Sequence, residues 1–481
     1  MVNADKYEAV IGLEIHAQLA TDSKLFCGDA ASFGAEPNTH ISPITMGHPG
    51  TLPKTNLKAV EYAIKLGIAC GSRIENNNYF ARKNYFYPDL PKGYQITQHT
   101  TPICVGGVIT IKGDTGDKIV QLNRIHLEED AGKSIHDISE LDTYIDLNRA
   151  GTPLVEIVTE PCIHSAQEAF LFVSEIRRLL RWIGVCDGNM EEGSLRCDAN
   201  ISIRLKGDTK LGTRVEVKNL NSIRNIKKAI EYEIERLIQI TEAGETIQQQ
   251  TRSFDANNDT TFSIRDKEDA NDYRYFPDPD LAPFQLTPQY IQDIETAMPV
   301  LPLALKNTWK SKYALSDYDV EQLCENKEEA DFYGAWVLQT KLYKSAANWI
   351  LGPIREYINE TGIRYSTLYA YIPYLVELLE MVASNQLSFS VASGKVFKAM
   401  MQENQSPSEY AKKYNLLQSN SSDEIEKWVD QALLMYPEKI IEYKKGKKGL
   451  IGLFTGEVKK ISQGKADPKI TIQLLEQKLK Q

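Results

Sequence analysis

The sequence predicts an α+β fold for the first 290 residues and helices for the remainder. Before residue 290, alternation of polar and apolar residues, which is typical of strands, recurs and is interrupted by helix-capping signals. After that point helical periodicity dominates. The 481 residues exceed one ordinary domain, and about three domains are expected. We place them at residues 1–290, 291–405 and 406–481.

The first strand is predicted at GLEIHAQL, residues 12–19. Because side chains alternate between the two faces of a strand, one face would carry Leu13, Ile15, Ala17 and Leu19, and the other Glu14, His16 and Gln18. A carboxylate, an imidazole and an amide on one face are the beginning of a metal or acid–base site. A half-buried strand with a polar, solvated face is the plainer interpretation.

Two later segments, LRCDANISIR at 195–204 and TRVEVKN at 213–219, alternate in the same way. Strands of this kind predict an antiparallel sheet with one packed face and one polar face. The first part of the chain therefore contains a sheet that other elements must cover.

Helices supply that cover. SAQE at 165–168 matches a capping box and begins a helix that runs to about Gly184. Asn221 or Ser222 can cap a second helix, which ends near residue 240. We expect both helices to lie on the packed face of the sheet. Farther on, STLYAYIPYLVELLEMVA has the apolar spacing of packed helices.

Composition narrows the class of protein. The chain is 42% hydrophobic and 25% charged, as in soluble globular proteins. It has no apolar run long enough to cross a membrane, and because MVNADKYEAV lacks a basic region followed by an apolar run, no signal peptide is expected there. Seven cysteines occur without a CxxC pair, which favours the reducing cytoplasm. A net charge of -10 argues against a general nucleic-acid coat, although a local basic patch is compatible with it.

Such a patch is predicted in the tail. Between positions 444 and 469 only Glu457 and Asp467 oppose a cluster of lysines. The cluster consists of Lys444, Lys445, Lys447, Lys448, Lys459, Lys460, Lys465 and Lys469. Lysines that neutralise RNA phosphates release counterions and bind in a salt-dependent manner. A solvated helix face is the alternative that residue identity alone favours.

Carboxylates beside apolar strand signals recur in the first domain, at GLEIH, HLEEDAGK, PLVEIVTEP and MEEGSLRCDAN. Mg²⁺ takes carboxylate oxygens and shares its shell with substrate phosphates, while Lys83, Lys133, Arg196 and Lys218 supply cations for phosphates. No GxxxxGK[ST] or GxGxxG motif is present. If the chain uses ATP, a sheet of carboxylates must hold it, as in glutamine-synthetase-like ligases that activate carboxylates.

Long strings of the sequence point to one family. They are VIGLEIHAQL, FGAEPNT, RKNYFYPDLPKGYQI, HLEEDAGKS, DLNRAGTPLVEIVTEP, MEEGSLRCDANIS, VKNLNS and DYRYFPDPDL. In this order they resemble the B subunits of aspartyl/glutamyl-tRNA amidotransferases, over residues 10 to about 284. GLFTGEVKKISQGKADPK is similar to the family's C-terminal domain, so the resemblance covers nearly the whole chain.

The resemblance implies both a fold and a reaction. The first domain would be a cradle related to glutamine synthetase, and the helical and tail domains would hold tRNA. ATP would phosphorylate the side-chain carboxylate of Glu on tRNA(Gln) or of Asp on tRNA(Asn), with Mg²⁺ neutralising phosphate charge. Ammonia from glutamine, hydrolysed on an amidase A subunit, would then displace phosphate. A small C subunit would tie A to B, giving a cytoplasmic heterotrimer.

Site residues follow from the matched strings. The resemblance makes Glu14, His16, Glu129 and Glu156 the expected metal ligands. Reading from the residues agrees on Glu14 and His16 but leaves Glu128 and Glu129 open, because alternation pairs His126 with Glu128 unless the chain turns there. Four residues in matched strings are expected to contact ATP or the acceptor end: Lys83, Lys133, Arg196 and Asp198. Of these, Lys83 and Arg196 are expected at the nucleotide. In the tail, the residues expected to bind tRNA are Lys444, Lys445, Lys447, Lys448, Lys459 and Lys460.

One departure from the family concerns zinc. Many members carry zinc-ligand cysteines as CxC and a later CxxC. Here the corresponding residues are Cys27-Gly28-Asp29 and the segment from Ser42 to Thr45. A single thiolate does not make a tetrahedral structural site, and no zinc is expected.

Two other functions compete with this one. A ligase that joins a small carboxylic acid to an amine could use the same sheet, but would not need the last 190 or so residues. A tRNA-binding scaffold without catalysis would tolerate the loss of Glu14 and His16. The sequence leaves open whether Glu-tRNA(Gln), Asp-tRNA(Asn) or both are substrates.

Overall fold

The computed structural model of the chain describes residues 6–113, 116–136, 138–266, 273–418, 422–462 and 464–480. Asp272, the first residue of the string DYRYFPDPDL, lies outside them. The chain divides into two units, Met1–Leu301 and Pro302–Gln481. The first extends beyond residue 290 because helix α4 (Pro288–Thr296) packs against α1 (Leu57–Ala69). The predicted boundary between residues 405 and 406 falls within the second unit, and it stays a prediction.

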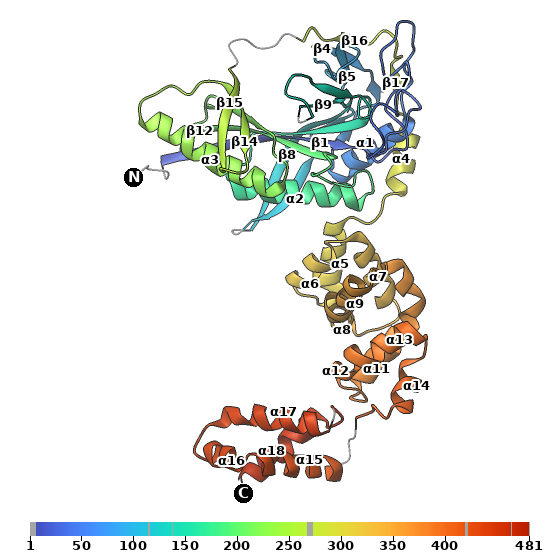
Figure 1. Ribbon diagram of the computed structural model, residues 1–481, viewed down its shortest axis with the longest axis vertical. Helices are drawn as coiled ribbons and strands as arrows, with labels where there is room; N and C mark the ends of the chain where they lie inside the picture. The colour runs from blue at the N-terminus through green and yellow to red at the C-terminus, as the bar shows by residue number, and fades with distance from the viewer. Residues whose placement is uncertain are drawn as a thin grey trace. The chain divides into compact units, whose positions relative to one another are not determined.

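The first unit is built on a 13-stranded sheet. Its main path runs in the order β15-β14-β13-β12-β1-β11-β8-β5-β4-β16, with β2, β6 and β7 joined at the side (Figure 1). The strands are β1 (Tyr7–Gln18), β2 (Arg73–Ile74), β4 (Ala81–Asn84), β5 (Tyr94–Thr97), β6 (Cys104–Val105), β7 (Val108–Gly113), β8 (Gly116–Glu129), β11 (Pro153–Thr159), β12 (Leu195–Leu205), β13 (Val215–Lys218), β14 (Gln250–Asp255), β15 (Thr260–Asp266) and β16 (Phe276–Pro277). Two small pairs accompany it, namely β9 (Lys133–Ile135) with β10 (Tyr144–Asp146), and β3 (Asn77–Asn78) with β17 (Phe284–Gln285).

The α+β prediction is confirmed, with one exception in strand direction. All pairings between described strands are antiparallel except that of β13 with β14, which is parallel. The chain passes from β13 to β14 through helix α3 (Ile223–Glu242). Parallel neighbours need such a crossover, whereas antiparallel neighbours can be joined by a short turn.

The alternation predicted for β1 and β12 is present in the fold. In β1, Leu13, Ile15 and Ala17 are at most 1% exposed, whereas Glu14 and His16 are half-buried on the other face. β12 buries its odd-numbered residues as far as position 203 and pairs with β1 along nearly its whole length. Burial of apolar side chains on one face contributes roughly 25 cal/mol per Å², which holds the polar face in a fixed orientation.

Helices cover the apolar face, as predicted. Helix α2 (Ala166–Trp182) packs beside α3, and α3 contacts β12 (Figure 1). Ser165 caps α2 by accepting from the Glu168 N–H, but the Glu168 carboxylate accepts from the His164 N–H, so the predicted capping box is only half formed. In α3 the cap is Ser222.

The second unit is helical. Its elements before residue 419 are α5 (Pro302–Tyr313), α6 (Asp317–Leu323), α7 (Lys327–Val337), α8 (Tyr343–Trp349), η2 (Ile350–Ile354), α9 (Arg355–Thr361), α10 (Tyr365–Leu368), η3 (Tyr369–Tyr371), α11 (Ile372–Ala383), α12 (Phe389–Val391), η4 (Ala392–Val396), α13 (Phe397–Glu403) and α14 (Pro407–Lys413). The tail contains α15 (Ser422–Met435), α16 (Pro437–Lys444), η5 (Lys448–Leu450), α17 (Ile451–Ile461) and α18 (Pro468–Lys480). Phe454, Val458 and Leu475 belong to a buried apolar cluster within the tail. Among the described residues, no helix is long and apolar enough to span a membrane.

Candidate functional site

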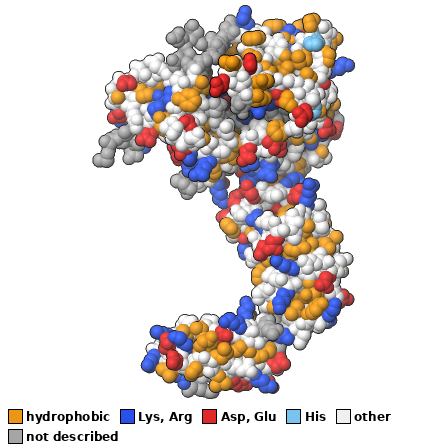
Figure 2. Space-filling view, in the orientation of Figure 1, with side chains coloured by type: hydrophobic (Ala, Val, Ile, Leu, Met, Phe, Trp, Pro, Cys, Tyr) orange, Lys and Arg blue, Asp and Glu red, His pale blue; other side chains and the backbone are white. Residues whose placement is uncertain are grey.

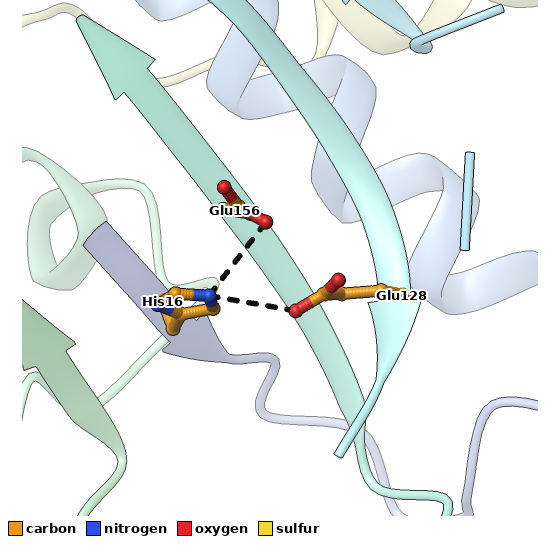
Figure 3. Close-up of side chains that lie close together, drawn as sticks. All are labelled: His16, Glu128 and Glu156. Carbon is orange, nitrogen blue, oxygen red and sulfur yellow. Dashed lines mark ion pairs between the residues drawn. The ribbon is translucent and has the colours of Figure 1, made fainter. Parts of the chain in front are cut away.

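Three side chains meet on the polar face at the centre of the sheet. His16, Glu128 and Glu156 come from the neighbouring strands β1, β8 and β11 and point toward one another (Figure 3). His16 Nε2 lies 3.6 Å from an oxygen of each carboxylate. One ligand atom from each residue falls within 4.8 Å of the others. Two carboxylates and one imidazole at this spacing fit a divalent cation.

Strand register explains why these residues meet. His16 in β1 is directly opposite Glu156 in β11, and Glu156 is opposite His126 in β8. Glu128 follows His126 by two residues and therefore shares its face. His126 adds a second imidazole, with its Nε2 3.2 Å from Glu156 Oε2.

A cavity of about 950 Å³ lies over this cluster. Its lining mixes acidic side chains, cations and aromatic rings from strands β1 to β15. The acidic group comprises Glu14, Glu128, Glu156, Asp198 and Glu216. The cations are Lys83, Arg124, Arg214 and Lys218, and the rings include Tyr85, His99, Tyr273 and Tyr275. A cavity with this lining accommodates a large, charged ligand with a flat aromatic portion.

The electrostatics of the cluster favour a bound cation. Burial raises the pKa of Glu14, and the neighbouring carboxylates Glu156 and Asp198 raise it further. Burial would also raise the pKa of Glu156, but attraction and hydrogen bonds from His126 and His16 hold it well below its usual value. Burial would lower the pKa of His126, but attraction and hydrogen bonds to Glu156 and Glu128 together outweigh it and raise that pKa to about 9. Carboxylates concentrated in a partly buried site thus draw positive charge toward themselves.

Three of the four expected metal ligands line this cavity, and the fourth does not. Glu14 lies beside the cluster, where its Oε1 accepts from Asn200 Nδ2 at 2.9 Å. Glu129 lies on the opposite face, where its carboxylate accepts from Lys92 Nζ at 2.6 Å and from the Ile96 N–H at 2.9 Å. β8 continues as a strand through Glu129, so adjacent residues point in opposite directions. The structure therefore brings Glu128, and not Glu129, to His16 and Glu156.

The other expected site residues are only partly gathered. Lys83 lines the cavity, with its Nζ 5.0 Å from the Tyr273 ring centre. Asp198 lines it as well and accepts from Lys218 Nζ at 2.6 Å. Arg196 instead lines an adjoining cavity of about 380 Å³, which shares His16, Lys83 and Glu128 with the first, and pairs with Asp130 at 2.7 Å. Lys133 is exposed on β9 and lines neither cavity.

Sequence reasoning did not single out several residues of the cavity. Arg124 shares a strand face with His126 and Glu128, so the alternation that located His126 could also have located Arg124. Tyr85 and Tyr275 lie in two of the strings that carry the family resemblance, nearly 200 residues apart. Only folding brings them together around Lys83, and no spacing rule would have paired them.

The positions related to the family's zinc cysteines do meet, but with different chemistry. Thr45 Oγ1 donates to Asp29 Oδ2 at 2.5 Å and lies 3.4 Å from Cys27 Sγ. The Ser42 hydroxyl is close enough to help lower the pKa of Asp29, against the effect of burial. One thiol, one carboxylate and two hydroxyls do not fit a structural zinc site. That the chain holds no zinc stays a prediction.

The tail lysines form two groups rather than one. Lys444 is the last residue of α16 and is followed by Lys445, Lys447 and Lys448, whereas Lys459 and Lys460 lie in the last turn of α17. A helix rises 1.5 Å per residue, which separates the groups by roughly 16 Å. Lys447 pairs with Glu442, and Lys460 with Glu457. On the visible face of the tail, at the bottom of Figure 2, basic side chains are scattered among apolar ones.

Family models match both units of the chain. Residues 9–292 match the GatB/GatE catalytic domain, and residues 331–479 match the GatB domain. The first unit thus contains a catalytic domain of the GatB/GatE class.

Named relatives specify the family further. The chain is 44% identical to the B subunit of the aspartyl/glutamyl-tRNA(Asn/Gln) amidotransferase of Persephonella marina, over 99% of this chain and 100% of the relative. Proteins of the same name from Geobacter sulfurreducens and Alkalilimnicola ehrlichii are 44% and 45% identical, over 98% of this chain and 99% of each relative. The chain belongs to the family of aspartyl/glutamyl-tRNA amidotransferase B subunits, as the sequence resemblance predicted.

Proposed function

We propose that this chain carries out the amidation step on mischarged tRNA: it converts Glu-tRNA(Gln), Asp-tRNA(Asn) or both to the amide form, using ATP and Mg²⁺. The observation that carries the proposal is the cluster of His16, Glu128 and Glu156 beneath a cavity of about 950 Å³. Nothing in an ordinary fold requires two carboxylates and an imidazole to converge at the centre of a sheet. Membership of the amidotransferase B family supports the same conclusion.

The proposed reaction has two steps. An oxygen of the substrate's side-chain carboxylate attacks the terminal phosphorus of ATP, the bond to the bridging oxygen breaks, and ADP leaves. Ammonia then attacks the acyl carbon, loses a proton, and expels phosphate, which leaves the amide. The first step is needed because a carboxylate repels nucleophiles and lacks a leaving group. Bound Mg²⁺ supplies charge neutralisation on the phosphates.

We assign a separate role in this reaction to each group of residues in and around the cavity. His16, Glu128 and Glu156 would hold the metal, with Glu14 beside them. Lys83 would neutralise phosphate charge at the cluster, where attraction to Glu128 and Glu156 outweighs burial and raises its pKa. Asp198, held by Lys218, would lie within reach of the incoming amine. Arg196 and Lys133 lie outside the main cavity and would act at its approaches.

Partners complete the proposal. We propose an amidase A subunit as the source of ammonia, a small C subunit that ties A to B, and a cytoplasmic location with the translation machinery. The first unit would be a glutamine-synthetase-like cradle, and the tail would bind tRNA. The named relatives, which the chain matches over nearly their whole length, are themselves subunits, and this supports a role within such an assembly.

The decisive experiment supplies the full chain with ATP, Mg²⁺, ammonia and Glu-tRNA(Gln), and measures Gln-tRNA(Gln). Product should form with ammonia, whereas glutamine should serve as donor only after the amidase partner is added. Free glutamate in place of the charged tRNA is the control, because a small-molecule ligase would amidate it. Amidation of free glutamate, or no product from the charged tRNA, would reject the proposed function.

A further inference from the structure

Arg124 is a cation of the cavity that the fold leaves without a partner. It lines the cavity from β8, and no ion pair or hydrogen bond of its side chain is found among the described residues; its Nε is buried and unpartnered. Half-burying a guanidinium without compensation is costly. Buried polar groups of native proteins usually have partners, so an unpartnered one is a sign of a missing ligand.

Its place on the strand relates it to the metal cluster. Arg124, His126 and Glu128 share one face of β8, two residues apart, or roughly 7 Å per step. In the neighbouring strand β11, Val158 is opposite Arg124, so no carboxylate faces it there. On its other side Arg124 is opposite the apolar Val105 of β6. The residues directly opposite Arg124 therefore offer its guanidinium no countercharge, and Glu156 on the same face of β11 is opposite His126 instead.

Charge on Arg124 also reaches the far wall of the cavity. There it adds to burial in lowering the pKa of the His99 imidazole. The His99 ring stacks on Tyr275, with ring centres 3.8 Å apart. The guanidinium thus shares a strand face with the metal cluster and acts on one of a pair of stacked rings.

Arg196, the arginine that the sequence suggested for the nucleotide, also has a buried Nε without a partner, but unlike Arg124 it makes an ion pair. Its Nη2 donates to Asp130 at 2.7 Å, and Asp130 also accepts from Gln18 Nε2. Its charge is therefore compensated within the protein, in the adjacent cavity. Arg196 therefore has an ion-pair partner within the protein, whereas Arg124 has none among the described residues.

We propose that Arg124 binds phosphate oxygens of the nucleotide, on the side of the metal cluster that leads toward His99. This assignment rests on the proposed function and adds a residue to it. A guanidinium presents its donors in a planar fork that matches two phosphate oxygens, which an ammonium does not. Lys83 at the cluster and Arg124 farther along β8 would then neutralise different parts of one polyphosphate chain. The carboxylates of the cavity repel a polyphosphate. Mg²⁺ and these two cations would offset that repulsion and allow the nucleotide to bind.

The test measures ATP binding to the full chain in Mg²⁺ by calorimetry, without tRNA. Arg124→Gln should weaken ATP binding by about tenfold or more, the loss expected for a charge-assisted hydrogen bond to phosphate. Arg124→Lys keeps the charge but loses the fork, and should recover only part of the affinity. Arg224→Gln is the matched control, since Arg224 is exposed at the start of α3 and has no ion-pair partner among the described residues.

Thermal unfolding of each variant shows whether it folds, and Arg124→Lys tests the assignment if Arg124→Gln does not. Unchanged ATP affinity in a folded Arg124 variant would overturn the assignment, as would a loss confined to the KM for charged tRNA. Failure of the wild-type chain to bind ATP would instead reject the proposed function, so the two failures are distinguishable. Weakening of ATP binding in both Arg124 variants, with Arg224→Gln unaffected, is the expected result.

Discussion

Each of the two units buries an acidic centre, and the two centres are completed in different ways. In the helical unit, Glu329 of α7 is 3% exposed, and its carboxylate accepts from Arg355 Nε at 2.8 Å, from Arg355 Nη2 at 2.6 Å and from the Tyr365 hydroxyl at 2.6 Å. One carboxylate thus meets one guanidinium. In the sheet unit, Glu128 and Glu156 share a site with two imidazoles and further carboxylates.

The difference separates a structural centre from a functional one. A buried ion pair with all its hydrogen bonds made needs nothing from outside, and removing one partner is what harms it. Carboxylates crowded beside one another at a cavity are stabilised by a bound cation and lower the stability of the fold without it. Substitutions at the two centres should therefore affect different properties, stability in one and activity in the other.

The largest effect is expected at the sheet centre. Glu14→Gln removes a carboxylate beside the proposed metal and should lower amidation by roughly 10- to 100-fold, as substitutions around metal sites do. Its free energy of unfolding should stay the same or rise, because burial and neighbouring carboxylates raise the pKa of Glu14 and so disfavour its charge in the fold. The glutamine oxygen can still accept from Asn200. Product formation with ammonia and urea unfolding measure the two effects on the purified chain.

Glu160→Gln is the control for this variant. Glu160 follows β11 by one residue and accepts from Asn123 Nδ2 at 2.7 Å, outside the cavity. It is therefore also a carboxylate bonded to an asparagine amide, and its loss should leave amidation at the wild-type level. If Glu14→Gln lost stability while keeping its activity, the sheet centre would be structural like that of Glu329.

The opposite result is expected in the helical unit. Glu329→Ala removes the carboxylate to which Arg355 and the Tyr365 hydroxyl donate, leaves Arg355 only its bonds to Gln322, and should lower the free energy of unfolding of that unit by about 2 kcal/mol. Ammonia-dependent amidation at a temperature where the chain is folded should be nearly unchanged. Urea unfolding followed by tryptophan fluorescence measures the first, since Trp336 and Trp349 are buried in this unit. A loss of amidation without a loss of stability would contradict the contrast between the centres.

Much of the fold could be predicted because its signals are local. Alternation places the strand faces of β1 and β12, and the capping serines place the starts of α2 and α3. Even the parallel pairing of β13 and β14 was within reach, because the helix predicted near 222–240 is the crossover that parallel strands need. The start of the helical unit was less accessible, since the packing of α4 on α1 joins segments more than 200 residues apart.

For the site, the sequence predicted which residues share a face of one strand, but not which residues of different strands meet. Glu14 and His16 follow from alternation, and the choice of Glu128 follows once β8 is known to continue straight. The ion pair that compensates the charge of Arg196 depends on Asp130, a residue of another segment. Charge compensation across segments is a property of the folded chain, and residue type alone does not reveal it.

The smallest effect is expected on tRNA binding by the tail. It extends the comparison of compensated and uncompensated charge to the surface of the protein. Lys444 and Lys445 have no ion-pair partner among the described residues, unlike Lys447, which pairs with Glu442. Changing both to glutamine should weaken tRNA binding a few-fold and lower the slope of log affinity against log salt by about 2, one counterion for each phosphate contact.

Lys312→Gln with Lys395→Gln is the matched control, since both lysines are exposed, on α5 and η4, outside the tail. Equal salt slopes for the two double variants would mean that Lys444 and Lys445 merely offset the negative end of α16. A lower slope in the tail variant alone would mean that the uncompensated lysines bind phosphate. The distinction between Arg124, which has no ion pair among the described residues, and Arg196, which pairs with Asp130, would then extend to the surface, where the lysines without ion pairs bind the ligand.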